Sequence, residues 1–479
     1  MPKLRFFNTL TRSVEDFTPA REDGIVRLYT CGPTVYDYLH VGNYRTYIFE
    51  DVLKRTLKLF GLPVRHVMNI TDVGHLTSDA DEGEDKLELG AKREGKTAWD
   101  IARFYEQTFI EDIKKLNIDF APEPDPARED APRAADILCR ATDHINEQAA
   151  MVDRLVLNRF TYDTADGIYF DTSMLPDYGK LAGAAHIAGL QEGARVAMGE
   201  KRNSTDFALW KFSPKGEQRQ MEWEYRGRKG FPGWHIECSS MGQTYLGESF
   251  DIHCGGVDHI PIHHTNEIAQ AEAATGKPFV RCWMHAEFLI MNKAKMAKSA
   301  GGFIKLADLE EKRIDPLDYR YFCFGAHYRK QLEFSWEGLQ AARTARRRLR
   351  DRVRGWLAES AAGVESAAVA QARRDFSATL ADDLNVPEAL ACVYGVLDNL
   401  GSAGERIAFL REAEKVLALG LFAAAKEECL PGDVQRAFED YVAARRDKNF
   451  AVSDALRSKL KDCGIQVLDS KDGSSWRRL

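Results

Sequence analysis

The sequence of 479 residues lacks several features that would place it elsewhere than in the cytoplasm. It has no apolar run long enough to span a membrane, and its first residues lack the apolar core of a secretory signal. We therefore expect a cytoplasmic protein with no membrane partner. Cysteine is sparse as well, with nine spread along the chain, so reduced thiols are expected and not a disulfide framework. A cysteine near histidine or glutamate is then best used as a metal ligand.

An excess of positive charge is also missing. The 66 Lys and Arg residues are outnumbered by 73 Asp and Glu residues, which gives a formal net charge of -7. A nucleic-acid partner would therefore have to be bound by a local basic patch. The strongest candidate is the arginine-rich run at residues 343–354, although such a run is more often a solvated helix face. The chain is also too long for one core, so about two to four domains are expected.

The first part of the chain predicts a βαβ unit. Residues 25–30 form an apolar, β-prone run, residues 42–60 repeat apolar side chains at helical spacing, and residues 64–73 predict a second strand. This order indicates a parallel sheet, in which ligands bind at the carboxyl ends of the strands. Cys31 and Thr71 lie at the ends of the two strands, so both are expected on that edge.

The later segments are predicted from their local patterns. Helices are expected at residues 134–157, 263–274, 434–444 and 451–460, in several stretches beyond residue 334, and after the cap Asn385 with its early Pro387. The parallel sheet is expected to resume at 206–211. A strand at 250–253 is expected to lead into a turn at Gly255-Gly256, and residues 465–478 predict a β-hairpin.

Two stretches could bind phosphate. His40-Val-Gly-Asn43 stands between the first strand and its helix, where free backbone N–H groups and the helix dipole favour anions. His40 and Asn43 could donate hydrogen bonds to phosphoryl oxygens, and Gly42 would leave room for a flat base. The motif is weak alone, because a histidine at a helix start is more often a cap.

The second stretch is Lys295-Met-Ala-Lys-Ser299, followed by glycines that would allow loop closure. Lys295 and Lys298 could hold the β- and γ-phosphates of ATP. The usual alternative is an exposed lysine loop, and the spacing of a Walker loop is absent.

A metal site is the third hypothesis. His263 and Glu267 are four residues apart and share one face of the predicted helix, and Cys31 and Cys238 offer thiolates. Two thiolates, one imidazole and one carboxylate suit zinc, although the spacing matches no compact zinc finger. Spacing alone leaves four competing ligands open: His235, His253, Cys254 and His264.

Together these stretches resemble the class I aminoacyl-tRNA synthetases, and within that class the cysteinyl-tRNA synthetases. The run from Cys31 to Asn43 is similar to the first signature, which is usually His-Ile-Gly-His or His-Ile-Gly-Asn. Lys295-Met-Ala-Lys-Ser299 resembles the second, Lys-Met-Ser-Lys-Ser. The runs Gly233-Trp-His-Ile-Glu-Cys-Ser and His-His-Thr-Asn-Glu267 mark the cysteine enzymes more specifically. The resemblance covers nearly the whole chain.

The resemblance implies ATP-dependent ligation of L-cysteine to tRNA(Cys) through a cysteinyl-adenylate, with one zinc ion per chain selecting the substrate thiolate. Mg²⁺ is expected with ATP, and a monomer is expected rather than a dimer. By position, the resemblance implies zinc on Cys31, Cys238, His263 and Glu267; cysteine binding by Thr71 and Trp234; catalysis by His40, Asn43, Lys295 and Lys298; and ATP binding by Gly42, Gly255, Gly256, Asp258 and Lys298.

The fold class expected from the sequence and the resemblance is α/β. A doubly wound parallel-sheet (Rossmann-like) catalytic domain carries an α/β insertion, and a helical bundle and a small C-terminal α+β domain follow. The predicted boundaries are 1–125 and 203–292 for the two halves of the catalytic domain, 126–202 for the insertion, 293–333 for the signature loop and stem-contact region, 334–428 for the bundle, and 429–479 for an anticodon-binding domain.

The chain departs from the family pattern at three places. Ala297 replaces a serine, Cys254 replaces a glycine, and residues 74–83 are inserted, all of which bear on loop geometry and not on the reaction.

Two rival functions remain. One rival is a cysteine ligase that uses an amino-sugar acceptor, which residues 434–479 disfavour because that class lacks a full anticodon-binding C-terminus. The other is a non-catalytic, zinc-stabilised RNA-binding protein, against which the two phosphate-binding stretches argue.

Overall fold

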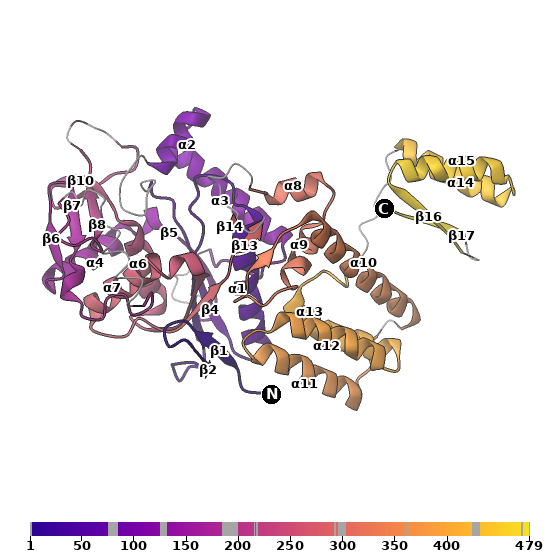
Figure 1. Cartoon of the computed structure of the whole chain (residues 1–479), viewed down its shortest axis with the longest axis horizontal. Helices are drawn as coiled ribbons and strands as arrows, with labels where there is room; N and C mark the ends of the chain where they lie inside the picture. The colour runs from indigo at the N-terminus through magenta and orange to yellow at the C-terminus, as the bar shows by residue number, and fades with distance from the viewer. Residues whose placement is uncertain are drawn as a thin grey trace. The chain divides into compact units, whose positions relative to one another are not determined.

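The computed structural model describes residues 2–74, 85–124, 132–183, 200–214, 216, 219–291, 294–295, 303–360, 362–423, 432–470 and 473–478. The chain forms two compact units, Met1–Leu421 and Phe422–Leu479 (Figure 1). Within the described ranges, no helix is both long enough and apolar enough to cross a membrane.

A five-stranded parallel sheet forms the centre of the first unit, in the order β12-β11-β3-β4-β5. Its strands are β3 (Val26–Thr30), β4 (Val64–Ile70), β5 (Asp136–Arg140), β11 (Phe250–Gly256) and β12 (Val280–Ala286). Every residue of β3 is buried, as expected for a central strand covered on both faces. The predicted βαβ unit is therefore confirmed, and the ends of β3 and β4 bring Cys31 and Thr71 to one edge.

Helices cover both faces of this sheet, which makes it doubly wound. Helix α1 (Val41–Leu59) packs Phe49, Leu53 and Leu57 against one face. Helices α6 (Trp234–Leu246) and α7 (His263–Thr275) share a separate core with residues of β3 and β4 on the other face. Helix α1 ends as predicted, with Phe60 at its cap and Gly61 at a φ of 78°.

One predicted helix and the predicted sheet of one strand were wrong. Residues 134–157 begin with β5 and become helical only at α4 (Ile145–Leu157). The burial of β5 alternates along an edge strand of five residues, and so short a period-2 pattern is easily missed beside a long helical one. Residues 206–211 do form a strand, β8 (Phe207–Phe212), but it belongs to a second sheet, because strand patterns do not specify partners.

This second sheet is antiparallel, in the order β6-β7-β8-β10-β9. Its other strands are β6 (Thr161–Asp163), β7 (Gly167–Phe170), β9 (Trp223–Tyr225) and β10 (Arg228–Pro232). Strand β10 leads directly into α6 through Gly233, where a Cβ would lie 2.1 Å from the carbonyl oxygen of Ala208. The close approach of the two backbones at Gly233 fixes the start of α6, and with it the positions of Trp234 and Cys238.

The remaining elements of the first unit are mostly helical. They are β1 (Arg5–Asn8), β2 (Ser13–Asp16), α2 (Lys86–Glu94), α3 (Ala98–Lys115), β13 (Leu289–Met291), β14 (Ala294–Lys295), β15 (Leu332–Glu333), α8 (Leu306–Glu311), α9 (Pro316–Cys323), α10 (Trp336–Glu359), α11 (Ala367–Ala381), α12 (Val386–Asn399) and α13 (Ala403–Leu417). Helix α12 starts at the predicted cap, Asn385, whose side chain accepts from the N–H of Glu388.

The second unit consists of α14 (Gly432–Arg446), α15 (Phe450–Asp462) and the antiparallel pair β16 (Ile465–Ser470) and β17 (Gly473–Arg478). The predicted helical pair and hairpin are both present. Tyr441, Leu460 and Ile465 contribute to its small core. The finer domain boundaries inside the two units stay a prediction.

A fully buried ion pair connects α1 to the helical part of the first unit. The guanidinium of Arg320 in α9 bonds Asp51 in α1, and it also donates to the carbonyl oxygens of Leu417 at 2.7 Å and Leu116 at 3.1 Å. Both charged side chains have 0% exposure. One guanidinium therefore joins α1, α9 and the ends of α3 and α13.

We expect Arg320→Met to lower the free energy of unfolding of the first unit by about 1–3 kcal/mol, because the buried Asp51 would lose one of its two arginine partners and keep only Arg55. Urea unfolding followed by circular dichroism measures this loss. The double variant D51N/R320M should lose less than the sum of the single variants, since neither charge is then stranded. Arg374→Met, at an exposed arginine that bonds Gln371, is the control and should change little. Equal stability of R320M and the parent would contradict the assigned role of the pair.

Candidate metal centre and phosphate loop

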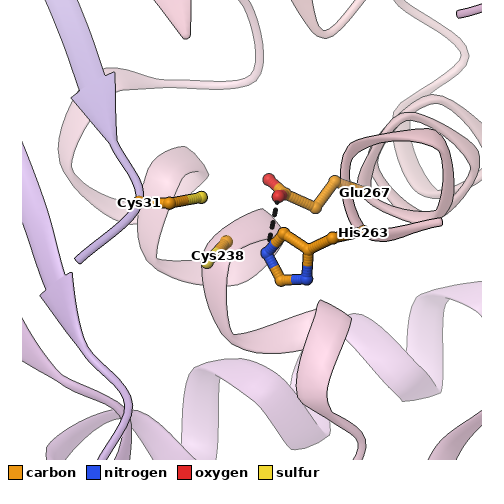
Figure 2. A group of neighbouring side chains, drawn as sticks. All are labelled: Cys31, Cys238, His263 and Glu267. Atoms are coloured by element: carbon orange, nitrogen blue, oxygen red, sulfur yellow. Dashed lines mark ion pairs between the residues drawn. The ribbon is translucent and has the colours of Figure 1, made fainter. Parts of the chain in front are cut away.

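Four side chains expected to bind metal lie together at the carboxyl edge of the parallel sheet (Figure 2). Cys31 follows β3, Cys238 lies in α6, and His263 and Glu267 lie one turn apart in α7. All four are buried, and their candidate ligand atoms lie within 4.8 Å of one another. Residues distant in the sequence thus form a compact donor set with two sulfurs, one nitrogen and one oxygen.

One carboxylate oxygen of this set lacks a hydrogen bond in the described part of the chain, and a bound zinc ion would give it a partner. Nε2 of His263 and Oε1 of Glu267 are 3.0 Å apart, yet Oε1 has no hydrogen-bond partner within the described residues. The imidazole nitrogen and the carboxylate oxygen are close enough to bind one metal ion between them. A buried carboxylate oxygen left in that state is otherwise costly, and a Cys₂HisGlu set matches the ligands that zinc prefers.

A rival set meets the same distance criterion. It combines Cys31 and Glu267 with His253 and His264. Its members contact one another, since Nε2 of His253 lies 2.9 Å from Oε2 of Glu267 and Nε2 of His264 lies 3.3 Å from Sγ of Cys31, and the members of the first set do so as well. The rival set offers only one thiol, whereas the first set offers two. We therefore favour the set that contains Cys238 and His263.

Two of the competing histidines contact proposed ligands instead of belonging to the favoured set. Nδ1 of His235 lies 2.9 Å from Nδ1 of His263, and His253 holds Oε2 of Glu267. Ligand residues are commonly oriented by such outer partners. Cys254 follows His253 in β11, so its side chain points to the opposite face of the sheet, where it packs in the core beside α1. Strand alternation thus removes Cys254 from the site.

The ionisable groups of the cluster shift one another's pKa values. Burial opposes the charge of His263, but Glu267 and Cys238 raise the pKa of His263 to about 10. Burial raises the pKa of the Cys31 thiol well above its usual value, and Cys238 adds to the increase. Burial also opposes ionisation of Cys238, but hydrogen bonds with Cys31 and His263 lower the pKa of Cys238 to about 7. The pKa of Glu267 falls to about 2 despite burial, because His253 and His263 stabilise its charge. At neutral pH the cluster therefore holds an ionised carboxylate and a thiol poised to lose its proton.

A buried hydrogen-bond chain runs beside the two thiols. The N–H of Gly32 donates to Oδ1 of Asn69 at 2.8 Å, and Nδ2 of Asn69 donates to Oγ1 of Thr71 at 3.1 Å. The Thr71 hydroxyl then donates to Oε2 of Glu237 at 2.8 Å. These hydrogen bonds link Gly32, the residue after Cys31, to Glu237, the residue before Cys238. Sequence analysis missed Asn69 and Glu237, although a polar side chain inside an apolar strand or helix is a usable signal.

The two residues expected to bind cysteine lie near this cluster. Thr71 is buried within the hydrogen-bond chain. Trp234, the first residue of α6, places its ring centroid 4.9 Å from that of His263. Their role in binding the amino acid stays a prediction.

His40 caps α1 and forms a reciprocal pair with Asn43. Nδ1 of His40 accepts from the N–H of Asn43 at 3.2 Å, and the N–H of His40 donates to Oδ1 of Asn43 at 3.1 Å. Because Nδ1 is an acceptor here, we assign the proton of the neutral ring to Nε2. A Cβ at Gly42 would lie 2.9 Å from Nδ1 of His40, so this glycine makes room for the imidazole. The expected space for a base beside Gly42 stays a prediction.

The expected turn at Gly255-Gly256 was wrong, because both glycines are the last residues of β11. A Cβ at Gly255 would lie 2.6 Å from Nδ1 of His259 and 2.8 Å from Cε1 of His264, and one at Gly256 would lie 2.4 Å from Oδ1 of Asp258. The glycines therefore let neighbouring side chains of this chain approach the strand closely. Adenosine binding by Gly255, Gly256 and Asp258 stays a prediction.

The second phosphate-binding stretch is described only in part. Lys295 is the last residue of β14, whereas Ala297 and Lys298 lie outside the described residues. Residues 75–83, which make up most of the insertion, also lie outside them. The roles expected for Lys295 and Lys298 stay predictions.

Comparison with known proteins gives concordant matches. Residues 17–344 match the family described as tRNA synthetases class I (C) catalytic domain. Cysteine--tRNA ligase 1 of Burkholderia lata is 48% identical over 98% of this chain and 96% of its own length. Cysteine--tRNA ligase of Treponema denticola is 40% identical over 99% of this chain and 100% of its own length.

A solved structure supports the fold alone. Methionyl-tRNA synthetase of Mycobacterium tuberculosis, in complex with methionyl-adenylate, aligns with a TM-score of 0.55 and 15% identity. The alignment covers 83% of this chain and 91% of that chain.

Proposed function

Because the chain belongs to the cysteine–tRNA ligases within the class I tRNA synthetases, we propose that it joins L-cysteine to tRNA(Cys) with ATP and Mg²⁺. The cysteine carboxylate attacks the α-phosphorus of ATP, and pyrophosphate leaves. A ribose hydroxyl of the terminal adenosine of the tRNA then attacks the adenylate, and AMP leaves. The observation that carries this proposal is the match over nearly the full length, joined by the buried Cys₂HisGlu cluster.

We propose that Cys31, Cys238, His263 and Glu267 hold zinc. When bound, zinc supplies a soft Lewis acid that takes up the substrate sulfur as a thiolate, which a serine hydroxyl matches poorly. Such a device answers a real need, because a pocket that works by shape distinguishes near-isosteres by only about 10²-fold. His235 and His253 keep two of the ligands oriented.

The phosphate side of the reaction is assigned to the loop that opens α1. Nε2–H of His40 can donate to a phosphoryl oxygen while Nδ1 remains bonded to the Asn43 N–H. The positive end of the α1 dipole adds to this stabilisation. Lys295 and Lys298 are proposed to neutralise the leaving pyrophosphate. In this scheme the protein acts by position and electrostatics and not by forming a covalent intermediate.

The acceptor distinguishes this function from that of an amino-sugar ligase. We expect ³⁵S-cysteine to become attached to tRNA(Cys) when ATP is present, and not to an amino sugar offered at the same concentration. Transfer to the amino sugar alone would support the rival function. Absence of any cysteine-dependent pyrophosphate exchange would support the non-catalytic one.

We propose that the second unit binds the anticodon part of the tRNA. Phe450 is 55% exposed at the start of α15, and the guanidinium of Arg445 lies 5.6 Å from the centre of its ring. Lys448 is exposed on the connection between α14 and α15. An exposed aromatic ring among cationic side chains is typical of surfaces on which unpaired bases stack.

Phe450→Ala is expected to raise KM for tRNA, because the loss of one stacked base costs about 1–3 kcal/mol, or about 5- to 150-fold. Cysteine-dependent pyrophosphate exchange should be unchanged, since that reaction needs no tRNA. Leu157→Ala, at a leucine that is 80% exposed in the first unit, is the matched control. The assignment is wrong if F450A aminoacylates tRNA with the KM of the parent.

A further inference from the structure

A cavity of about 260 Å³ lies at the amino edge of the parallel sheet, whereas the metal cluster lies at the carboxyl edge. Arg27 and Arg65, the second residues of β3 and β4, reach it from the sheet. Arg21, Arg133 and Tyr245 are other lining residues. None of these residues has a part in the proposed ligation.

The cavity concentrates positive charge. Arg27 and Arg65 are direct partners in the parallel pairing of β3 and β4, so their side chains stand next to each other on one face. Like charges in such positions repel each other. Asp23 accepts two hydrogen bonds from Arg27, at 3.1 and 2.7 Å, and so balances one of the two charges.

The charge of Arg65 has no carboxylate partner among the described residues. Its one hydrogen bond within the described part of the chain runs to the carbonyl oxygen of Arg133 at 3.4 Å, and its buried Nε has no partner there. Burial, and then the charge of Arg27, lower the pKa of Arg65. A half-buried guanidinium beside another arginine is costly unless an anion approaches it.

Arg21 adds a guanidinium bonded to neutral groups. It donates to the carbonyl oxygens of Leu246 at 2.9 Å and Ser249 at 3.4 Å. It packs over Gly247, where a Cβ would lie 2.5 Å from Nη2 of Arg21. Among the described lining residues, four arginines therefore face a single carboxylate, that of Asp23.

We propose that this cavity is a second anion site, which binds the phosphate group of a phosphate-bearing ligand. Guanidinium groups match phosphate oxygens through paired N–H donors, and a dianion offsets more of the excess charge than a carboxylate could. The hydroxyl of Tyr245, held 2.8 Å from Nε2 of His144, adds a polar group to the wall. The site is separate from the expected ATP site because it lies at the other edge of the sheet.

The test is equilibrium dialysis of the full chain against ³²P-labelled inorganic phosphate at low ionic strength. We expect saturable binding by the parent and at least a tenfold weaker affinity in Arg65→Gln, equivalent to about 1.4 kcal/mol, because the variant lacks a charged hydrogen-bond donor to phosphate. Arg65→Lys, which keeps the charge, should lose less. Arg374→Gln changes an exposed arginine outside the cavity and should bind as the parent does.

Competition identifies the source of the phosphate group. Displacement by tRNA would indicate a nucleic-acid phosphate, and displacement by pyrophosphate but not by tRNA would indicate a small molecule; either result supports the site. If R65Q does not fold, Arg21→Gln carries the same test, since the Arg21 guanidinium bonds main-chain oxygens. No saturable binding by the parent, or equal binding by the parent and the glutamine variant, would overturn the proposal.

Discussion

Replacing Cys238 with alanine is expected to release bound zinc and to reduce cysteine-dependent ATP–pyrophosphate exchange to background. The side chain is buried and supplies one of the two sulfurs of the candidate set. Its loss leaves three donors and removes the thiol whose pKa of about 7 makes it the readier of the two to ionise. Metal analysis after dialysis and the exchange assay measure the two effects.

A variant at a second buried cysteine is the control for C238A. Cys282→Ala removes another buried thiol, on β12, from the core beside α1, outside both candidate ligand sets. It should keep zinc and exchange activity. His235→Ala should weaken metal binding by about 10- to 100-fold without abolishing it, as expected for an outer partner of a ligand. Retention of both zinc and exchange by C238A would remove Cys238 from the site.

Replacing His40 with alanine is expected to slow pyrophosphate exchange by about 10²- to 10³-fold, the usual effect of removing one donor to a developing charge. The reciprocal bonds with Asn43 hold the ring and make Nδ1 an acceptor, so the proton of the neutral imidazole is on Nε2. Zinc content should not change, because His40 lies in neither candidate ligand set. Initial rates at saturating cysteine and ATP measure the effect.

Capping and catalysis by His40 can be separated. Asparagine is a favourable N-cap, so His40→Asn should preserve the start of α1, whereas H40A should also lose about 1 kcal/mol of stability. Both variants should be slow in exchange if the imidazole acts on phosphate. An H40N enzyme as fast as the parent would show that the histidine serves only as a cap.

The sequence predicts those elements whose pattern is long and whose ends are marked. Helix α1 has a repeated apolar face and a terminal glycine, and α12 has Asn385 as its cap. The prediction from the sequence was wrong at β5, because five residues give too little periodicity. It also assigned β8 to the wrong sheet, because the partners of a strand depend on the whole chain. Register and sheet membership are set by contacts between distant segments, which a local pattern does not contain.

The candidate site shows the same limit. Ligand spacing left His253 and Cys254 open, and the residues carrying the family resemblance narrowed the set. The structure adds the reason, because successive residues of β11 face opposite sides of the sheet and only His253 faces the cluster. Asn69 and Glu237 were missed because a single buried polar residue says little about its partner until the fold brings the two together.

The central claim is that a zinc ion on Cys31, Cys238, His263 and Glu267 selects cysteine by its sulfur. X-ray absorption at the zinc edge, on the full chain with and without amino acid, tests it most directly. The account predicts two sulfur neighbours without substrate, three with L-cysteine, and still two with L-serine. A zinc ion without sulfur neighbours from the protein, or a sulfur count that L-cysteine leaves unchanged, would contradict it.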